Sequence, residues 1–401
     1  WNTAGWIDLS SRIGNAIAPL VGAGTDELIV GDSTSVNLYK ALSAAIAICK
    51  TDAPMRKRIV SERSNFPTDL YIADSLAREH GFTLELIEAE DLGRHLNDDL
   101  AVLMLTHVNY CTGRMHDMAR VSRAAHKAGA LVIWDLAHSA GAVPVALHGG
   151  AANEAADFEG QTSEAADFED QASEAADFAV GCGYKYLNGG PGAPAFVWAH
   201  PRHLRRMDRE QWRQPLSGWL GHAAPFEFTP DYRPAPGIQR FVCGTPPVLA
   251  MAALECGVAV FTAAEALGGL AALRAKSLAL GALFIELVEA RCAGHGLALV
   301  TPRDDALRGS QVSFGHAQGF AVMQALIARG VIGDFRAGRM APPAQDGTRA
   351  IDIESADLLR FGFTPLYTRF IDAWDAVEQL REVLASGEWR EARFNQRAAV
   401  T

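Results

Sequence analysis

The feature that most constrains the fold is a series of continuous apolar segments over residues 1–245, each separated from the next by an amphipathic helical pattern. A segment that is apolar at every position indicates a strand buried on both faces. Helices between such strands predict a mainly parallel sheet of about seven strands covered on both sides, which is an α/β fold. The predicted strands are 58–61, 101–108, 130–135, 178–182 and 193–198, and the predicted helices include 36–50 and 118–128.

The pattern changes after residue 245, where a long helix-rich stretch covers 248–292. Shorter apolar strands and two further amphipathic helices follow it, which is typical of an α+β domain. We therefore expect a large domain over 1–245, then a long linking helix and a small C-terminal domain over 246–401. The predicted elements of the small domain are strands 297–300, 310–314 and 331–335, and helices 320–329 and 370–384.

The acidic charge of the chain is concentrated in one repeated segment. The sequence Glu-Ala-Ala-Asp-Phe occurs at 154–158, 164–168 and 174–178, and residues 153–176 hold eight acids and no base. The formal net charge is −11, so the remainder carries only −3, and nucleic acid is a poorly supported partner. We interpret 153–176 as an inserted tandem duplication forming an exposed excursion, helical or disordered.

The positions of the cysteines and the lengths of the apolar runs argue against several classes of protein. The six cysteines form no C-x-x-C pair, which argues against a zinc site or a disulfide framework and predicts a reducing cytoplasm. We expect no membrane-spanning segment and no bound metal. The first residues do not resemble a signal peptide. The chain begins with Trp1 rather than Met, so we expect the natural N-terminal segment to be missing.

Lys185 is the strongest candidate for a catalytic residue. It follows the apolar strand 178–182 and leads into the glycine-rich stretch 187–192. A buried, unpaired ammonium is costly, so a lysine there either reaches solvent or has a function. Asp135 ends an earlier strand; it could cap the following turn, but it is also the carboxylate that keeps a pyridinium nitrogen protonated. Together the two residues indicate pyridoxal 5'-phosphate (PLP), with Lys185 as its Schiff-base nucleophile.

Other candidates also lie at or just after predicted strand ends. Ligands of parallel sheets bind at the carboxyl ends of the strands, so Asp69, Thr106, Asp135 and Lys185 are expected at one edge. The stretch 31–35 precedes a helix and could hold an anion or simply cap that helix. Three further residues have open alternatives: Phe66 could stack on a planar ring or pack within its loop, Arg360 could hold a carboxylate or pair internally, and Trp219 could line a site or be structural.

At this point the motifs are similar to those of the bacterial kynureninase family. They are Trp134 to Gly141, Tyr184 to Gly192, Ser64 to Asp69, Ser217 to His222, and Arg360 to Tyr367. The resemblance extends from Trp1 to the C-terminus, apart from insertions. It implies a PLP-dependent homodimer of fold type I, like aspartate aminotransferase, that hydrolyses L-kynurenine to anthranilate and L-alanine in tryptophan catabolism, a route linked to NAD biosynthesis.

The resemblance also implies roles for individual residues. Lys185 would carry the cofactor and move protons, Asp135 would pair with the ring nitrogen, and Tyr184 would contact the phosphate end and help in proton transfer. Arg360 would hold the substrate carboxylate. The remaining implied cofactor contacts are Thr34 and Ser35 at the phosphate, Phe66 and Asp69 at the ring, Thr106 and His138 along the pocket, and Trp219 and Thr245 from the partner subunit.

The chain departs from the family pattern at its N-terminus, at 153–176 and at the loop 341–357. Thr245 stands where animal relatives tend to carry Asn, which favours kynurenine over 3-hydroxykynurenine as substrate. Two alternatives remain: another PLP enzyme of this fold, such as an aminotransferase or a cysteine desulfurase-like protein, or an inactive scaffold altered by truncation and insertions. Cys243 and Cys256 lie in apolar contexts rather than on the glycine-rich loop that a desulfurase nucleophile needs.

Overall fold

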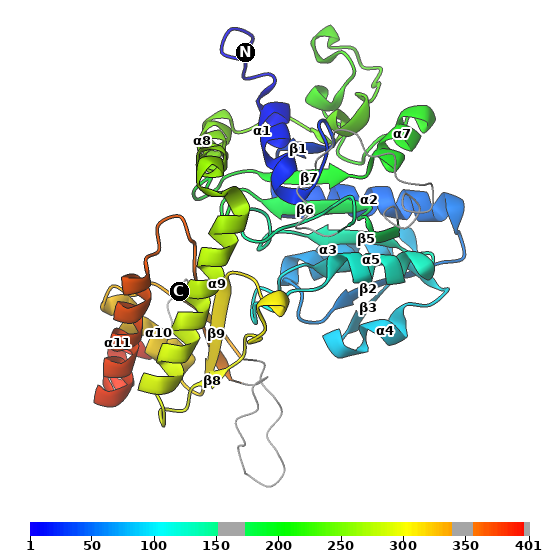
Figure 1. The fold of residues 1–401 in the computed structure, drawn as a ribbon. Helices are drawn as coiled ribbons and strands as arrows, with labels where there is room; N and C mark the ends of the chain where they lie inside the picture. Colours follow the sequence, from blue (N-terminus) through cyan, green and yellow to red (C-terminus); the bar gives the residue numbers. More distant parts are fainter. Residues whose placement is uncertain (151–172, 339–355, 397–401) are drawn as a thin grey trace. The chain divides into compact units, whose positions relative to one another are not determined.

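The computed structural model describes residues 1–150, 173–338 and 356–396. It contains two compact units, one of residues 1–108 and 116–271 and the other of residues 109–115 and 272–401. The first unit holds a seven-stranded sheet and the second a four-stranded sheet (Figure 1). The domain boundary predicted at 245/246 stays a prediction, and the repeat from 153 to 172 and the loop from 341 to 355 lie outside the described residues.

The sheet of the first unit has the order β1-β7-β6-β5-β4-β2-β3. Strands β3, β2, β4, β5 and β6 pair in parallel, and β7 runs antiparallel to both β6 and β1. The mainly parallel α/β sheet predicted from the apolar segments is therefore confirmed. Its strands are β1 (Leu28–Val30), β2 (Arg58–Glu62), β3 (Thr83–Ile87), β4 (Leu100–Thr106), β5 (Leu131–Asp135), β6 (Phe178–Cys182) and β7 (Ala195–Ala199).

Helices cover both faces of this sheet, as its uniformly apolar strands require (Figure 1). Met104 and Ile133 belong to the same buried cluster as apolar residues of α2 and α3. Trp134 points to the opposite face, where its indole Nε1 donates to Ser122 Oγ of α5 at 3.2 Å. The helices of this unit are α1 (Leu9–Ile17), α2 (Thr34–Asp52), α3 (Pro67–His80), α4 (Leu92–His95), α5 (Met118–Lys127), α7 (Pro201–Glu210) and α8 (Val248–Ala264).

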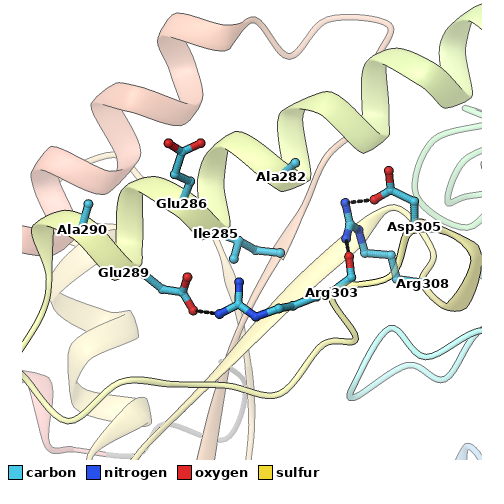
Figure 2. Close-up of a pocket in the computed structure, with 8 residues that line it drawn as sticks. All are labelled: Ala282, Ile285, Glu286, Glu289, Ala290, Arg303, Asp305 and Arg308. Carbon is cyan, nitrogen blue, oxygen red and sulfur yellow. Dashed lines mark hydrogen bonds and ion pairs between the residues drawn. The ribbon is translucent and has the colours of Figure 1, made fainter.

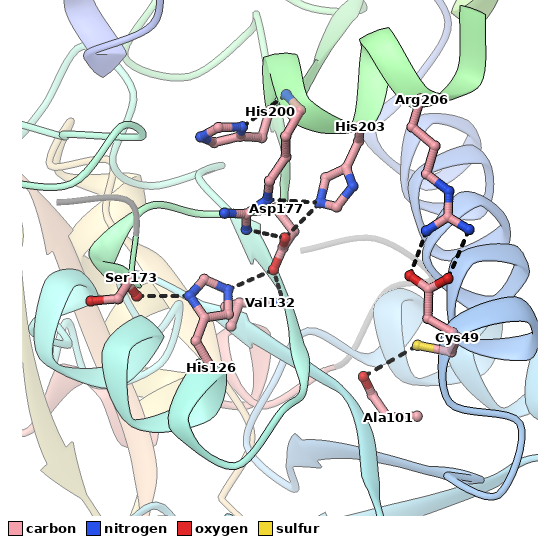
Figure 3. Close-up of polar contacts among 11 residues, drawn as sticks. Cys49, Ala101, His126, Val132, Ser173, Asp177, His200, His203 and Arg206 are labelled. Atoms are coloured by element: carbon pink, nitrogen blue, oxygen red, sulfur yellow. Dashed lines mark hydrogen bonds and ion pairs between the residues drawn. The ribbon is translucent and has the colours of Figure 1, made fainter. Parts of the chain in front are cut away.

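A buried carboxylate fixes the point where the chain re-enters the sheet after residues 151–172. Asp177 stands directly before β6 and is fully buried. Its oxygens accept hydrogen bonds from Val132 N at 2.7 Å, His126 Nε2 at 2.8 Å and His203 Nε2 at 2.6 Å, and it pairs with the Arg202 guanidinium (Figure 3). These bonds place β6 in register beside β5 although an acidic segment lies between the two strands in the sequence.

The second unit is an antiparallel sheet of order β10-β11-β9-β8 with helices packed against it. Its core includes Phe284, Phe314, Leu326, Leu359 and Val377, all almost completely buried. The α+β character predicted for the C-terminal region is present. The elements are α9 (Gly269–Arg291, which begins in the first unit), β8 (Ala298–Leu299), β9 (Gln311–His316), α10 (Gly319–Ala328), β10 (Asp334–Arg336), β11 (Asp357–Gly362) and α11 (Phe370–Ser386).

One helix bears on the expectation that the chain has no membrane-spanning segment. The apolar helix Val248–Leu267, which comprises α8 and the short helical turn after it, is long and apolar enough to cross a membrane. Within the described residues no other helix qualifies, and 28% of its most apolar stretch is buried. A core helix of a soluble protein passes the same test, so the helix alone decides nothing about membranes.

Candidate functional site

The carboxyl edge of the seven-stranded sheet brings together the lysine and the aspartates predicted from the sequence. Strand register sets Thr106 at the end of β4 opposite Asp135 at the end of β5, and Asp135 opposite Val180 of β6. Lys185 follows β6 after a short turn. Asp69 lies in the first turn of α3 and is 3% exposed. This is the edge where parallel sheets bind ligands.

The three charged groups at this edge interact electrostatically. Burial raises the pKa of Asp135, and the nearby Lys185 ammonium opposes that shift. Burial also raises the pKa of Asp69, well above its usual 3.8, and the Asp135 charge adds to the effect. Two buried carboxyls that share one lysine disfavour being ionised together. A second cation placed between them would relieve this repulsion.

The hydrogen bonds of the two carboxyls leave acceptor capacity for such a cation. Asp135 Oδ1 accepts from Ala137 N at 2.8 Å. Asp69 Oδ2 is buried and has no hydrogen-bond partner within the described part of the chain. Unsatisfied buried acceptors are uncommon in native proteins and call for a partner. The protonated ring nitrogen of PLP, held by Asp135 beside Asp69, would bring a compensating positive charge to both carboxyls, so the residues at this edge fit the cofactor that the sequence implies.

Tyr184 lies beside the lysine and is about half exposed. The Lys185 ammonium stands 5.4 Å from the centre of the Tyr184 ring. Burial, with the neighbouring Cys182 thiol and the two aspartates, raises the pKa of Tyr184 to about 12. Its hydroxyl therefore keeps its proton at neutral pH.

The glycines around Lys185 allow close packing rather than mobility. A side chain at Gly183 would put its Cβ 2.3 Å from Pro194 O, and the Gly183 N–H donates to that same oxygen at 3.0 Å. The turn that carries Lys185 therefore rests directly on the backbone just before β7. A lysine on so rigid a support has a defined direction, which catalysis by proton transfer requires.

Trp219 and Thr245 belong to two segments that are bonded to each other. Leu220 N donates to Cys243 O at 3.2 Å, and a Cβ at Gly218 would lie 2.2 Å from that oxygen. The Trp219 ring also contacts Phe226 and Phe228, with ring centres 5.9 and 6.4 Å away. No contact joins these residues to Lys185 within the described single chain, so their predicted role through a partner subunit stays a prediction.

The other predicted cofactor residues lie in the same unit. Thr34 and Ser35 are the first two residues of α2, whose N-cap Ser33 accepts from Val36 N at 3.3 Å. Phe66 precedes α3 and is 44% exposed, which leaves its ring accessible for stacking. His138 is buried in the turn after β5. Their predicted roles in cofactor binding stay predictions.

Arg360 belongs to the second unit, on β11. Register sets it opposite Asp334 of β10, and its guanidinium pairs with the Asp334 carboxylate. Arg360 Nη1 also donates to Tyr110 O at 2.7 Å, and Arg336 Nη1 donates to Asp334 Oδ1 at 2.7 Å. The sequence analysis did not predict Asp334 as the partner of Arg360. The signal that could have identified it is an acidic residue on an apolar strand that pairs with the strand of Arg360.

A pocket of about 490 Å³ lies elsewhere in the second unit, between α9 and residues 303–308. Its cations are already neutralised, because Arg303 pairs with Glu289 and Arg308 pairs with Asp305 (Figure 2). None of the predicted site residues lines it. We therefore do not take this pocket as the candidate site.

Two family models and several curated relatives match this chain. The model of the kynureninase C-terminal domain matches residues 273–380, and the class-V aminotransferase model matches residues 11–150. Curated relatives named kynureninase include one from Burkholderia mallei (strain SAVP1), 51% identical over 404 residues, and one from Pseudomonas fluorescens, 50% identical over 404 residues. Each alignment covers 100% of this chain and 85% of the relative.

Solved structures of similar fold include a cysteine desulfurase and a protein with a PLP cofactor. A cysteine desulfurase from Thermococcus onnurineus NA1 superposes with a TM-score of 0.69 at 19% identity, covering 96% of this chain and 86% of that one. A mutant of the protein C-DES with glycine covalently linked to its PLP cofactor has a TM-score of 0.69 at 15% identity, with 96% and 86% coverage. At these identities the likeness shows the fold, which is PLP fold type I.

Proposed function

Since the chain belongs to the kynureninase family, we propose that the residues at the carboxyl edge of the sheet perform its PLP-dependent reaction. The activity is hydrolysis of L-kynurenine by water to anthranilate and L-alanine. The observation that carries the residue assignment is the electrostatic grouping of Lys185 with two buried aspartates, one of which keeps an unused acceptor.

Bound PLP would supply an electron sink for the charge left at Cα by proton removal and for the charge left at Cβ when the Cβ–Cγ bond breaks after water has added at Cγ. Asp135 would hold the ring nitrogen in its protonated form, and Asp69 would add a second carboxyl beside the ring. Lys185 would hold the cofactor covalently at rest and move the proton at Cα. Tyr184, which keeps its proton at neutral pH, would help to return a proton to Cβ, the carbon that becomes the methyl group of alanine.

Thr34, Ser35 and Tyr184 would bind the phosphate group, and Phe66 would cover the ring face. Thr106 and His138 would line the pocket, while Trp219 and Thr245 would reach the phosphate end from the partner subunit. Arg360 would bind the substrate carboxylate bidentately, with Asp334 holding its guanidinium plane. The proposed preference for kynurenine over 3-hydroxykynurenine as substrate is based on Thr245 alone.

A homodimer is the assembly that the surface of the first unit supports. Leu249 and Leu267 on the apolar helix Val248–Leu267 are 87% and 82% exposed, and Phe228 is 77% exposed. Large apolar side chains exposed to this degree are candidates for an interface. We propose that a second copy covers them, rather than a membrane or a nucleic acid. Light scattering should give twice the chain mass of 43.0 kDa, and a monomer would contradict the dimer.

We also propose that the protein is soluble and cytoplasmic. The structure has six free cysteines and no disulfide among the described residues. Free thiols in this number are typical of a reducing compartment. The proposed reaction belongs to tryptophan catabolism. The large domain over 1–245 and the small domain over 246–401 remain the proposed division.

Anthranilate fluorescence after addition of L-kynurenine and PLP tests the function. The wild type should release anthranilate and alanine in equal amounts, whereas Lys185→Ala should release neither above background. Lys127→Ala, an exposed lysine of α5, is the matched control and should keep full turnover. Release of sulfide from cysteine, or of a keto acid from an amino acid, with no anthranilate would instead favour the desulfurase or aminotransferase alternative.

A further inference from the structure

Lys40 of α2 is a second buried lysine, and the reaction described above gives it no role. Its side chain is 1% exposed. The ammonium Nζ lies 2.5 Å from Asp32 Oδ2, 2.6 Å from Phe241 O and 3.3 Å from Asn37 Oδ1. All three neighbours are acceptors, so the lysine is fully hydrogen-bonded in the folded chain.

These bonds hold the loop Gly31–Ser35, which we call the phosphate loop, in an unusual conformation. Asp32 has a φ of +51°, in the left-handed region that few residues with a side chain adopt. Ala195 N donates to Asp32 O at 3.0 Å, and Asn37 Nδ2 donates to Gly31 O at 2.9 Å. A residue kept in this region requires surrounding structure to fix it, and such positions are common at functional sites.

The charge of Asp32 would oppose the proposed role of the loop unless it is neutralised. Asp32 directly precedes Ser33, Thr34 and Ser35, which offer N–H groups and hydroxyls at the N-terminus of α2. A phosphate dianion suits such an N-terminus, but an unpaired carboxylate beside it repels the phosphate. The buried ammonium of Lys40 neutralises the negative charge of the Asp32 carboxylate. Its bond to Phe241 O also ties the loop to the segment that leads to Thr245.

Stability alone gives a weak reason for this ion pair. Lys40 is buried and loses its hydration, whereas the Asp32 side chain is 31% exposed, so solvent screens part of the attraction that would offset this loss. We propose that Lys40 is a positioning residue for the phosphate group of the cofactor, which fixes Asp32 in its left-handed conformation and neutralises its carboxylate. This inference rests on the proposed function, since it assigns the phosphate to this loop.

Titration of the full-length apoenzyme with PLP and with pyridoxal, which lacks the phosphate, tests the inference. Lys40→Met should weaken PLP binding about 10- to 100-fold, the range expected for loss of a charge-assisted interaction, and should change pyridoxal binding by less than about twofold. The double variant Asp32→Asn with Lys40→Met removes both charges, and asparagine tolerates the left-handed region. It should restore PLP affinity to within about threefold of wild type.

Matched controls separate this role from a purely structural one. Lys50→Met, at the exposed end of the same helix, should leave both affinities unchanged. Lys40→Gln replaces Lys40→Met if the latter does not fold, with the same expectation. PLP affinity equal to wild type, or equal losses for PLP and pyridoxal, would overturn the inference.

The outcome also distinguishes this inference from the proposed function. A wild type that releases anthranilate, together with a Lys40→Met variant that keeps its PLP affinity, refutes the positioning role alone. A wild type that binds no PLP refutes both.

Discussion

Replacing Asp177 by Asn should be among the most destabilising conservative changes in the first unit. Asp177 is fully buried before β6 and is the shared acceptor of Val132 N, His126, His203 and Arg202 (Figure 3). Asparagine has the same shape but no charge, and its amide nitrogen would face N–H donors. Because β6 leads to Lys185, loosening this point also loosens the support of the catalytic lysine.

The size of the effect follows from these contacts. Asparagine keeps one acceptor oxygen, so two of the four charge-assisted bonds are lost at roughly 1.5–3 kcal/mol each. The resulting range of about 3–6 kcal/mol agrees with roughly 3–5 kcal/mol for breaking a buried ion pair. At an unfolding entropy of ~2.1 cal/mol/K per residue, a chain of 401 residues should lose about 5 °C in Tm for a loss of ~4 kcal/mol.

The pH dependence of this difference gives a second test. Burial alone would raise the pKa of Asp177, but the hydrogen bonds from His126 and His203, with the charges of His203 and Arg202, take it well below 3.8. The unfolded chain therefore binds this proton at higher pH than the folded chain does. The stabilisation is complete above about pH 4 and is lost as pH falls towards the lowered native value.

Thermal unfolding of wild type and Asp177→Asn, at pH 7 and at several values below 4, measures both effects. Asp167→Asn is the matched control, because Asp167 stands in an identical Glu-Ala-Ala-Asp-Phe segment of the repeat. If that segment is an exposed excursion, Tm should not change. A Tm shift below about 1 °C for Asp177→Asn, an equal shift for Asp167→Asn, or a wild-type advantage that persists undiminished at low pH would each refute the reasoning.

Three further predictions concern the site. Asp135→Asn should lower kcat about 10²–10⁴-fold, as expected for the loss of a buried ionic partner of the ring nitrogen. The apoenzyme should be at least as stable as wild type at pH 7, because burial already raises the pKa of Asp135. A less stable apoenzyme in calorimetry would contradict this. Arg360→Lys should raise KM for kynurenine about 10- to 100-fold with a smaller change in kcat, because lysine cannot bind a carboxylate bidentately. An unchanged KM in steady-state kinetics would exclude Arg360 as the residue that binds the substrate carboxylate. Gly218→Ala should destabilise the protein by roughly 1–3 kcal/mol and weaken PLP binding, because the new Cβ would lie 2.2 Å from Cys243 O. Denaturation and cofactor titrations that match wild type would show that this close contact is not needed.

The sequence predicted the part of the fold that depends on local pattern. The strands that end at Thr106 and Asp135, and the strand that precedes Lys185, are continuous apolar runs in the sequence. Parallel pairing then places those ends at one edge without knowledge of the strand order. The interaction of Lys185 with Asp135 could therefore be expected from the residues alone.

What the sequence did not reveal depends on contacts between distant residues. The edge strand β1 has only three residues, and the edge strand β3 mixes polar and apolar residues, so neither carries a clear pattern of its own. The acceptors of Lys40 and the donors to Asp177 come from segments up to 201 residues away, and no local signal links them. Asp334 became apparent only when the register of β10 and β11 set it opposite Arg360.

Mass spectrometry of the PLP-loaded enzyme after borohydride reduction tests the central claim most directly. Reduction converts the bond between cofactor and lysine into a stable one, so the modified residue can be identified in a peptide digest. The account predicts one phosphopyridoxyl group per chain, on Lys185. A group on another lysine, or none on an enzyme that still releases anthranilate from kynurenine, would contradict it.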